Sequence, residues 1–475
     1  MTRQTPLQLS PLDPRSAEPL YRQIYWRLRR AIGSGALKPG DRIPSARALM
    51  LELGLARGTI ETAYSMLAAE GYIEANGQAG SFVSRALKPR APVGADAAPP
   101  AANRAGPPTF RPETTLPFQM GLPALDAFPR KVWARLGAAK IRAMSPADMA
   151  HPPIAGLPEL RAQIAAYLHV ARGIACTAAQ VFVTSGYHAT MRLIGQALLA
   201  AGDPVWIESP CYPPTRGSLL AQRLQAIPVP VDAQGLMVEE GVRQAPRARA
   251  AIVTPAHQSP LGVSLSLPRR LALLDWARRA GSWIVEDDYD GEYRYVGRPL
   301  PALKSLDREG RVLYAGTFSK VLFPGIRLAY LVVPAGQLKA FDAACETGSG
   351  SSPQLTQAIL SDFIAQGHFA RHIQRMRKLY AQRRTETVAA LREVLGARVA
   401  IDEAPGGMHL ILRLQGRQSD RALVARMLAA GLYAEALSDW AGGDRLPPAI
   451  LVGFTNIETR AEATALAGRI LALMR

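Results

Sequence analysis

Residues 312–327 read VLYAGTFSKVLFPGIR and combine a short apolar run, a lysine and an arginine. The run Val312–Ala315 is predicted to be a buried strand, and Lys320 follows it after a glycine-containing turn. Most lysines lie on protein surfaces, but this chain has only eight, and Lys320 alone stands in such a setting. A lysine forms a Schiff base with an aldehyde only when burial or neighbouring cations lower its pKa. Lys320 is therefore a candidate for covalent chemistry, and Arg327 could bind a phosphate with two hydrogen bonds.

Further apolar runs alternate with helical patterns beyond residue 150, which predicts a largely parallel sheet with helices on both faces. From about Arg371 the pattern changes to one long helix, two short strands, and a further helix and strand, which indicates a smaller second lobe. The basic stretch 371–378 in the long helix could contact DNA phosphates or could form a solvated face. The predicted strands of the large lobe are Val181–Thr184, Val205–Glu208, Ala250–Val253, Trp283–Glu286, Val312–Ala315 and Leu328–Val333.

Three more features fall at the carboxyl ends of these strands, where ligands bind in such sheets. Residues 185–188 join a strand to a helix beginning near Ala189, so backbone amides there could hold a phosphate, although most such glycine turns hold nothing. Residues 286–290, EDDYD, could place a carboxylate against a pyridinium nitrogen, or could form a solvated loop or a cation site. Tyr212 could stack on a planar cofactor or could simply pack in its loop.

A separate pattern of short helices lies before these strands. Apolar residues recur every four positions over residues 19–34, which predicts an amphipathic helix. Ser45 is suited to cap a second helix that Gly54 ends, and a third helix is expected from near Arg57 to before Gly71. Two short helices joined by a tight turn form a helix-turn-helix, and two β segments within residues 72–83 would form a wing.

The third helix of this unit would present Arg57 and Thr59 to base edges or phosphates, while Arg47 on the preceding helix could reach the DNA backbone. On periodicity alone, the segment could also be a small helical domain. Residues 19–74 resemble the winged-helix domain of GntR-family transcription regulators over their whole length, which implies DNA binding. Ala56 departs from that family, which often has Ser there, so one phosphate contact is lost.

Residues 86–112 are rich in Ala and Pro and lack hydrophobic periodicity, which predicts a linker between a domain over 1–85 and a body over 113–475. We expect the large lobe of the body to reach about residue 350 and the small lobe to occupy about 370–475. At about 3.1 Å per residue, an extended linker of this length could span about 80 Å.

The composition restricts the class of protein. Hydrophobic residues make up 48% and charged residues 20% of the 475, and no apolar run approaches the length of a membrane span, which excludes a disordered or transmembrane protein. The net charge of +18 suggests a polyanionic partner, although the excess is spread along the chain. Three distant cysteines predict neither a disulfide framework nor a metal site. Because no secretory signal precedes the body, we expect a cytoplasmic protein.

Together, the features at the strand ends resemble the large domain of fold-type I, class I aminotransferases, over essentially residues 113–475. The resemblance implies pyridoxal 5'-phosphate as the cofactor and Lys320 as the residue that carries it in an internal aldimine. It also implies Asp287 at the pyridine nitrogen, Tyr289 at the phenolic oxygen and Tyr212 stacked on the ring. The residues that would surround the phosphate are Ser185, Gly186, Tyr187, Thr317, Ser319 and Arg327.

The resemblance fails at the contact to the phenolic oxygen. Aminotransferases usually carry Asn-Pro-x-Gly where this chain has His257-Gln258-Ser259-Pro260-Leu261-Gly262. Ser259 stands in the place of that asparagine, so the contact is altered or is made by His257 or Gln258.

Two further departures bear on catalysis. The arginine that binds a substrate carboxylate in class I enzymes should lie near Leu451 and is absent, although Arg445 or Arg216 could substitute. Residues 148–156 lack the tyrosine that aminotransferases often place near the phosphate of the neighbouring subunit. Both losses lower the expectation of efficient transamination and leave binding intact.

A GntR winged helix, a Pro-rich linker and this fold in one chain resemble the MocR-type (GabR-like) transcription regulators, as do residues 121–135 and 371–378. The resemblance implies a head-to-tail homodimer in which each winged helix packs near the partner's large body. Two-fold symmetry then predicts paired half-sites in a double-stranded DNA operator.

We therefore expect a regulator that senses an amine, an amino acid or the cofactor itself. Formation of an external aldimine would release Lys320, change lobe closure and shift the spacing of the two winged helices. One alternative is a competent aminotransferase that carries a DNA-binding module, against which Leu451 argues. Another is a sensor of cofactor concentration that ignores amines.

Overall fold

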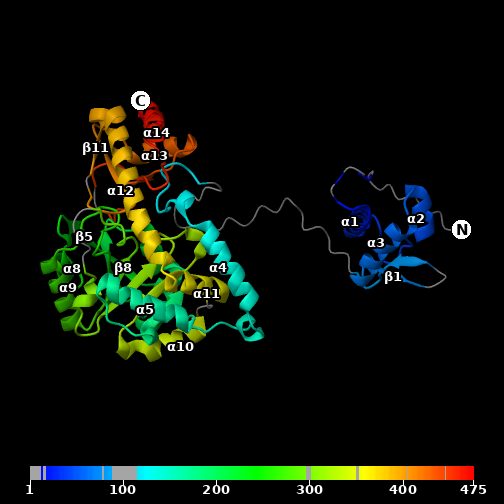
Figure 1. Cartoon of the computed structure of the whole chain (residues 1–475), viewed down its shortest axis with the longest axis horizontal. Coiled ribbons are helices and arrows are strands. Elements are labelled where there is room, and N and C mark those ends of the chain that lie inside the picture. The colour runs from blue at the N-terminus through cyan, green and yellow to red at the C-terminus, as the bar shows by residue number, and fades with distance from the viewer. Residues whose placement is uncertain are drawn as a thin grey trace. The chain divides into compact units, whose positions relative to one another are not determined.

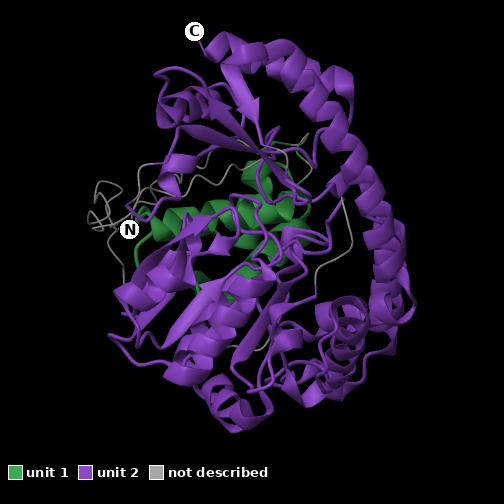
Figure 2. Cartoon of the chain, turned by 90° about the vertical axis from the view of Figure 1, so that its left-hand side faces the viewer, with its two compact units in different colours: residues 1–111 green, residues 112–475 purple. Residues whose placement is uncertain are grey.

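The computed structural model describes residues 12–13, 16, 18–76, 80–87, 115–295, 301–348, 352–402, 404–443 and 446–474. The chain divides into two compact units, residues 1–111 and 112–475 (Figures 1 and 2). Apart from its first two residues, the predicted linker lies outside the described residues. Within the described ranges, no helix is long and apolar enough to cross a membrane.

The small unit has the predicted helices and wing. Helices α1 (Leu20–Gly33), α2 (Ala46–Leu53) and α3 (Arg57–Ala69) are followed by strands β1 (Ile73–Ala75) and β2 (Ser81–Val83), which pair antiparallel. The Ser45 hydroxyl accepts a hydrogen bond from the Ala48 amide at 3.1 Å and caps α2. Gly54 ends that helix with φ +65°, a left-handed conformation that few other residues adopt. Buried residues of all three helices and the wing form one core, among them Ile24, Leu28, Leu49, Ile60, Leu67 and Val83.

An eight-stranded sheet forms the centre of the large lobe, in the order β3-β10-β9-β8-β7-β4-β5-β6. Strands β4, β5, β7, β8 and β9 are parallel, whereas β10 is antiparallel to both of its neighbours and β6 is antiparallel to β5. The sheet is therefore mixed. The strands are β3 (Val181–Thr184), β4 (Pro204–Ser209), β5 (Gln225–Asp232), β6 (Gly235–Leu236), β7 (Ala250–Val253), β8 (Trp283–Asp288), β9 (Val312–Thr317) and β10 (Ala329–Val332).

Helices cover both faces of this sheet, as the alternation of patterns predicts (Figure 1). Side chains that alternate along the strands pack on one face against α6, α7 and α10, and on the other against α5, α8, α9 and α11. The helices of the large lobe are α4 (Arg130–Ala143), α5 (Pro158–Arg172), α6 (Tyr187–Leu198), α7 (Pro213–Ala221), α8 (Val238–Gln244), α9 (Leu267–Ala280), α10 (Leu338–Gly348) and α11 (Gln354–Ala365).

The small lobe is built on the long helix α12 (His368–Leu395) and a four-stranded antiparallel sheet in the order β11-β12-β14-β13. Figure 1 shows α12 running from the large lobe into the small one. A core of buried apolar side chains joins α12 to the sheet and to the last two helices. The remaining elements are β11 (Val399–Ile401), β12 (His409–Leu414), α13 (Asp420–Ala429), β13 (Glu435–Ala436), β14 (Ala449–Gly453) and α14 (Arg460–Leu473).

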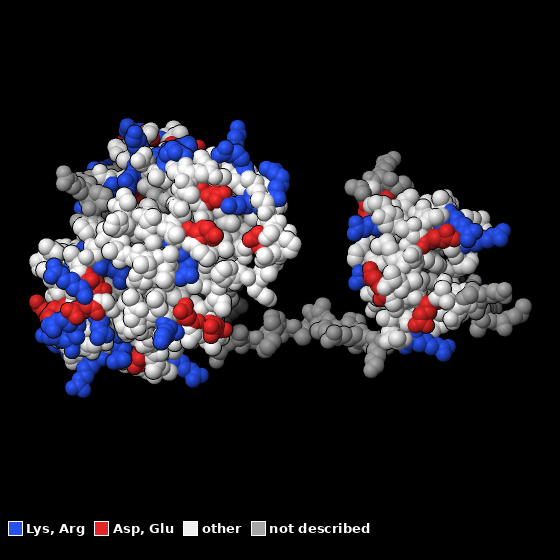
Figure 3. All heavy atoms as spheres, turned by 60° about the horizontal axis from the view of Figure 1, so that its bottom comes forward, with Lys and Arg blue, Asp and Glu red and all other residues white. Residues whose placement is uncertain are grey.

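The basic stretch of α12 faces two ways. His372 and Met376 are buried, whereas Arg371, Arg375 and Lys378 are exposed. Figure 3 shows Lys and Arg side chains spread over the visible face of the large unit, with Asp and Glu among them. The exposed residues of this stretch form a solvated face, and contact with DNA phosphates stays a prediction.

Candidate functional site

The acidic run at the end of β8 divides between the two faces of the sheet, because successive side chains of a strand alternate. Glu286 accepts hydrogen bonds from the amides of Leu303 and Lys304, each at 2.8 Å. Asp288 forms a buried ion pair with Arg172, with an N–O distance of 2.9 Å. Both acids are thus bound within the fold, and Asp287 is the acid of β8 that lies on the opposite face.

Asp287 is in an environment that disfavours its negative charge. Burial, together with the nearby acids Asp288, Glu208 and Asp290, raises the pKa of Asp287 to about 8, while Lys320 acts in the opposite direction. A cationic ring nitrogen beside this carboxyl would compensate the charge and favour the ionised form. The position of Asp287 is therefore compatible with its predicted role as the partner of the pyridine nitrogen.

Lys320 lies at the turn after β9, as predicted, and the residue is half-buried. Its Nζ donates a hydrogen bond to the Gly121 carbonyl at 3.1 Å, and a Cβ at residue 121 would collide with Nζ. Burial lowers the pKa of Lys320, while the charges of Glu435, Asp290 and Asp287 raise it. A lysine with a lowered pKa has a larger neutral fraction, which is the form that attacks an aldehyde.

The turn from β3 into α6 forms a cradle with Arg327. Helix α6 begins at Tyr187, two residues before the predicted start, with Gly186 at φ +107° as its N-cap. A Cβ at Gly186 would lie 3.6 Å from the guanidinium carbon of Arg327, which is exposed. Among the described residues, no side chain caps α6 and no acid lies in its first turn. The N-terminus of α6 and an arginine thus converge as a phosphate site requires.

Two hydroxyl residues of the predicted phosphate site lie on the turn that carries Lys320. The Ser319 amide donates a hydrogen bond to Thr317 Oγ1 at 3.1 Å, which fixes this turn locally. Ser185 precedes the Gly186 turn and is half-buried. The cradle therefore has hydroxyls near its amides and guanidinium.

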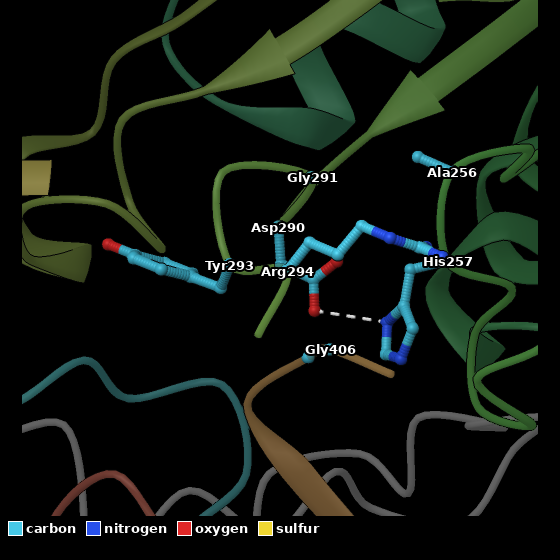
Figure 4. Close-up of a pocket in the computed structure, with 8 residues that line it drawn as sticks. Ala256, His257, Asp290, Gly291, Tyr293, Arg294 and Gly406 are labelled. Carbon is cyan, nitrogen blue, oxygen red and sulfur yellow. Dashed lines mark ion pairs between the residues drawn. The ribbon is translucent and has the colours of Figure 1, made fainter. Parts of the chain in front are cut away.

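Tyr289 contacts His257, which in turn contacts an aspartate. His257 Nδ1 lies 2.9 Å from the Tyr289 hydroxyl and 3.2 Å from Asp290 Oδ2. Figure 4 shows His257 and Asp290 joined by this last contact. Together with Arg294 they line a small cavity of about 20 Å³. His257 Nε2 and Arg294 Nε have no hydrogen-bond partner in the described part of the chain. Two partnerless nitrogens beside a cavity of this size suit one water molecule.

The segment that replaces Asn-Pro-x-Gly separates its side chains. Ser259 hydrogen-bonds to Tyr289, so Ser259 and His257 both act on that phenol. Gln258 points elsewhere and donates to Glu208 at 3.2 Å and to the Pro210 carbonyl at 2.8 Å. Of the two alternatives to Ser259, His257 and not Gln258 therefore contacts Tyr289, the residue predicted to lie at the phenolic oxygen.

Tyr212 belongs to a group of aromatic rings that spans both lobes. Its ring centroid lies 5.7 Å from that of Tyr187 and 5.8 Å from that of Trp440 in the small lobe. The Tyr212 side chain is 38% exposed, which leaves a ring surface available for stacking.

Sequence reasoning missed Glu435 and Trp440, which approach the site from the small lobe. Glu435 accepts a hydrogen bond from Trp440 Nε1 at 3.0 Å, and its charge acts on Lys320. No local motif marks either residue, because β13 has only two residues.

The expected site of a carboxylate-binding arginine is apolar. Leu451 is fully buried in a cluster with Ile411, Leu437 and Trp440. Arg216 donates a hydrogen bond to the Ala441 carbonyl at 3.1 Å, and Arg445 lies outside the described residues.

The predicted DNA-contacting residues lie on the surface of α2 and α3. Arg47 and Arg57 are exposed, and Thr59 is half-buried. Arg57 begins α3 and forms an exposed ion pair with Glu61, one turn later, at 2.7 Å. An exposed pair of this kind contributes little to stability and can exchange its partner for a phosphate.

The comparisons with known proteins agree with both units. Residues 125–439 match the family model "Aminotransferase class I and II", and residues 20–83 match "Bacterial regulatory proteins, gntR family". The chain is 38% identical over 436 residues to a probable rhizopine catabolism regulatory protein, MocR, of Rhizobium meliloti, covering 90% of this chain and 88% of that protein. It is 33% identical over 463 residues to the pyridoxine biosynthesis transcriptional regulator PdxR of Corynebacterium glutamicum, covering 96% and 95%.

The body also matches solved enzymes. The structure of LysN, an α-aminoadipate aminotransferase from Thermus thermophilus complexed with N-(5'-phosphopyridoxyl)-L-leucine, superposes with a TM-score of 0.69 at 25% identity, covering 76% of this chain and 92% of that one. In this chain the gntR match precedes the aminotransferase match, and the alignments with the two regulators named above extend over both matched regions. The chain therefore belongs to the MocR-type transcription regulators, in which a GntR-family DNA-binding unit is joined to an aminotransferase class I and II domain.

Proposed function

We propose that this regulator uses the site at Lys320 to sense a small amine or amino acid and transmits its occupancy to DNA binding. The cofactor is pyridoxal 5'-phosphate. The observation that carries the proposal is the convergence of Lys320, Asp287 and the Gly186–Arg327 cradle at one edge of the sheet. Each group suits a different part of one planar, phosphorylated aldehyde.

The bound cofactor supplies an aldehyde that reacts with amines and a ring that withdraws electrons. Lys320 would hold the cofactor through Nζ, and the depressed pKa of that amine favours its neutral form. Asp287 would keep the ring nitrogen protonated, and Arg327 with the first amides of α6 would bind the phosphate. His257 positions the Tyr289 hydroxyl toward the phenolic side of the site.

Coupling to DNA requires a change that reaches the small unit. A ligand that displaces Lys320 and contacts Glu435 or Trp440 would favour a different closure of the two lobes. We infer a head-to-tail homodimer in which that closure changes the spacing of two DNA-binding units on paired half-sites, in the cytoplasm. Support comes from the expected reach of the linker and from membership of the family.

The apolar cluster at Leu451 favours a regulator over an efficient aminotransferase, because Leu451 stands where the sequence comparison expects a carboxylate-binding arginine. A visible absorption spectrum of the purified holo-protein, recorded while pools of amines and amino acids are added, tests this. We expect one pool to shift the cofactor band to a stable new species. Decay to pyridoxamine 5'-phosphate, reversed by a keto acid, would show a competent aminotransferase instead.

A further inference from the structure

The residue opposite the missing arginine is an acid. In the small sheet, Glu435 of β13 pairs directly with Leu451 of β14, so the two are cross-strand neighbours. Leu451 therefore stands where the related enzymes bind the carboxylate of a substrate, and the side-chain carboxylate of Glu435 lies beside it. The local charge is the reverse of what an amino-acid substrate needs.

The Glu435 carboxylate is held in a fixed orientation. The Tyr433 hydroxyl donates to Oε1 at 2.7 Å, and Trp440 Nε1 donates to Oε2 at 3.0 Å. A carboxylate has about four acceptor positions, so two hydrogen bonds leave capacity for another donor. Both donors are neutral, so neither compensates a negative charge on Glu435. Burial raises the pKa of Glu435, and a cation beside it would favour the ionised form, as the charge of Lys320 does.

Aromatic rings lie between Glu435 and the large lobe. Trp440, which binds Glu435, stands 5.8 Å from the ring of Tyr212, and Tyr212 stands 5.7 Å from Tyr187. Faces of Trp and Tyr rings attract ammonium groups. The charge of Glu435 raises the pKa of Lys320, and the charge of Lys320 lowers the pKa of Glu435. The acid is therefore close enough to interact with the amine that would react at the cofactor.

From this arrangement we propose that Glu435 selects effectors with a second cationic group, which makes the effector class diamines and not amino acids with a terminal carboxylate. One amine reacts at the cofactor, and the other is received by Glu435 and the rings of Trp440 and Tyr212. A terminal carboxylate in the same place would face Glu435 without a compensating cation. This inference rests on the proposed function, because it names the ligand of the same site.

Three probes with four-carbon chains test the proposal: 1,4-diaminobutane, n-butylamine and 4-aminobutyrate. Each is titrated into the full-length holo-protein while the cofactor absorbance and Trp fluorescence are followed. We expect half-saturation by the diamine at a concentration about tenfold lower than by butylamine, with 4-aminobutyrate the weakest, as a charged hydrogen bond implies.

Glu435→Gln removes the charge and keeps the shape. This variant should reduce the preference for the diamine over butylamine to within about twofold. The matched control is Glu393→Gln, which removes an exposed acid paired with Arg460 in the same lobe and should leave the preference unchanged. The titrations of the wild type with the three probes can refute the proposal by themselves. The test therefore remains valid even if Glu435→Gln does not fold.

Equal half-saturation by all three probes, or an unchanged preference in folded Glu435→Gln, would overturn the role of Glu435. The proposed function would survive that outcome if any of the amines still altered both the spectrum and the affinity for DNA. If none of the three altered the spectrum, this inference would fail, while the titration with pools of amines and amino acids would still decide the proposed function.

Discussion

Among single residues, Asp287 shows how strand geometry assigns chemistry to one of several neighbouring acids. Glu286 and Asp288 are bound by backbone amides and by Arg172, and Asp287 is left on the face of the cofactor site. Asp287→Asn should raise the dissociation constant of pyridoxal 5'-phosphate about 10- to 100-fold, since a hydrogen bond to a charged group contributes about 1.5–3 kcal/mol. Equilibrium dialysis measures this, and an unchanged constant would exclude Asp287 as the partner of the ring nitrogen.

The raised pKa of Asp287 leads us to expect that the stability of the cofactor-free protein depends on pH. The pKa of Asp287 is raised to about 8, against about 3.9 for an unfolded aspartate. A carboxyl whose pKa is raised by folding contributes stability that is lost as the pH rises through the folded pKa. Between pH 7 and 8.5, the wild type should therefore lose free energy of unfolding relative to Asp287→Asn. Urea denaturation at both values provides the comparison, and parallel losses in the two proteins would contradict the raised pKa.

Lys320, Asp287 and Arg327 could be located from the sequence because each lies beside or within a strongly apolar strand: Asp287 near the end of β8, Lys320 after β9 and Arg327 before β10. Their roles toward the cofactor stay predictions. Glu435 and Trp440 could not be located in this way, because their position depends on how the small lobe packs across more than 100 residues of sequence. The choice between His257 and Gln258 likewise required their partners, Tyr289 and Glu208.

For the elements, the N-terminus of α6 is the clearest candidate for the phosphate. Gly186→Ala should weaken cofactor binding at least about tenfold, because φ +107° strains an alanine by about 1–3 kcal/mol and the added methyl would approach Arg327. Gly202→Ala is the matched control, since Gly202 has φ +91° but its Cβ would meet open space. Absorbance titration of both variants with the cofactor distinguishes general strain from loss of the cradle. Equal affinities would place the phosphate elsewhere.

Helix α3 carries the prediction for DNA. Arg57→Ala should lower affinity and reduce the slope of log K against log salt concentration by about 0.9, the value for one lost phosphate contact. Fluorescence anisotropy at several salt concentrations measures the slope. Arg417→Ala, on an exposed turn of the small lobe, controls for the change in net charge. A slope that matches the wild type would show that Arg57 does not contact a phosphate.

The helices and most strands followed from periodicity, but two features of the large sheet did not. Strand β5 contains Pro228 and Pro230, which obscure a strand pattern, yet both are accommodated near the edge of the sheet. Strand β10 is as apolar as the parallel strands of the same sheet, so its antiparallel direction depends on the connection that follows Lys320 and not on its composition.

For the whole molecule, the account requires that two separately folded units communicate. The family shows that a DNA-binding unit and an aminotransferase domain belong to one regulator, and the site explains which chemistry the large unit can detect. Coupling is an equilibrium property, so an effector must bind more tightly to one DNA-binding state than to the other.

The most direct test of the central claim is the affinity of the full-length holo-protein for an operator fragment, selected by the protein from random duplex DNA, with and without an amine that shifts the cofactor spectrum. We predict that the amine changes the affinity of the wild type several-fold, and that Lys320→Ala binds the same DNA without any response to the amine. An identical response in wild type and Lys320→Ala would contradict the claim that Lys320 links the effector to DNA.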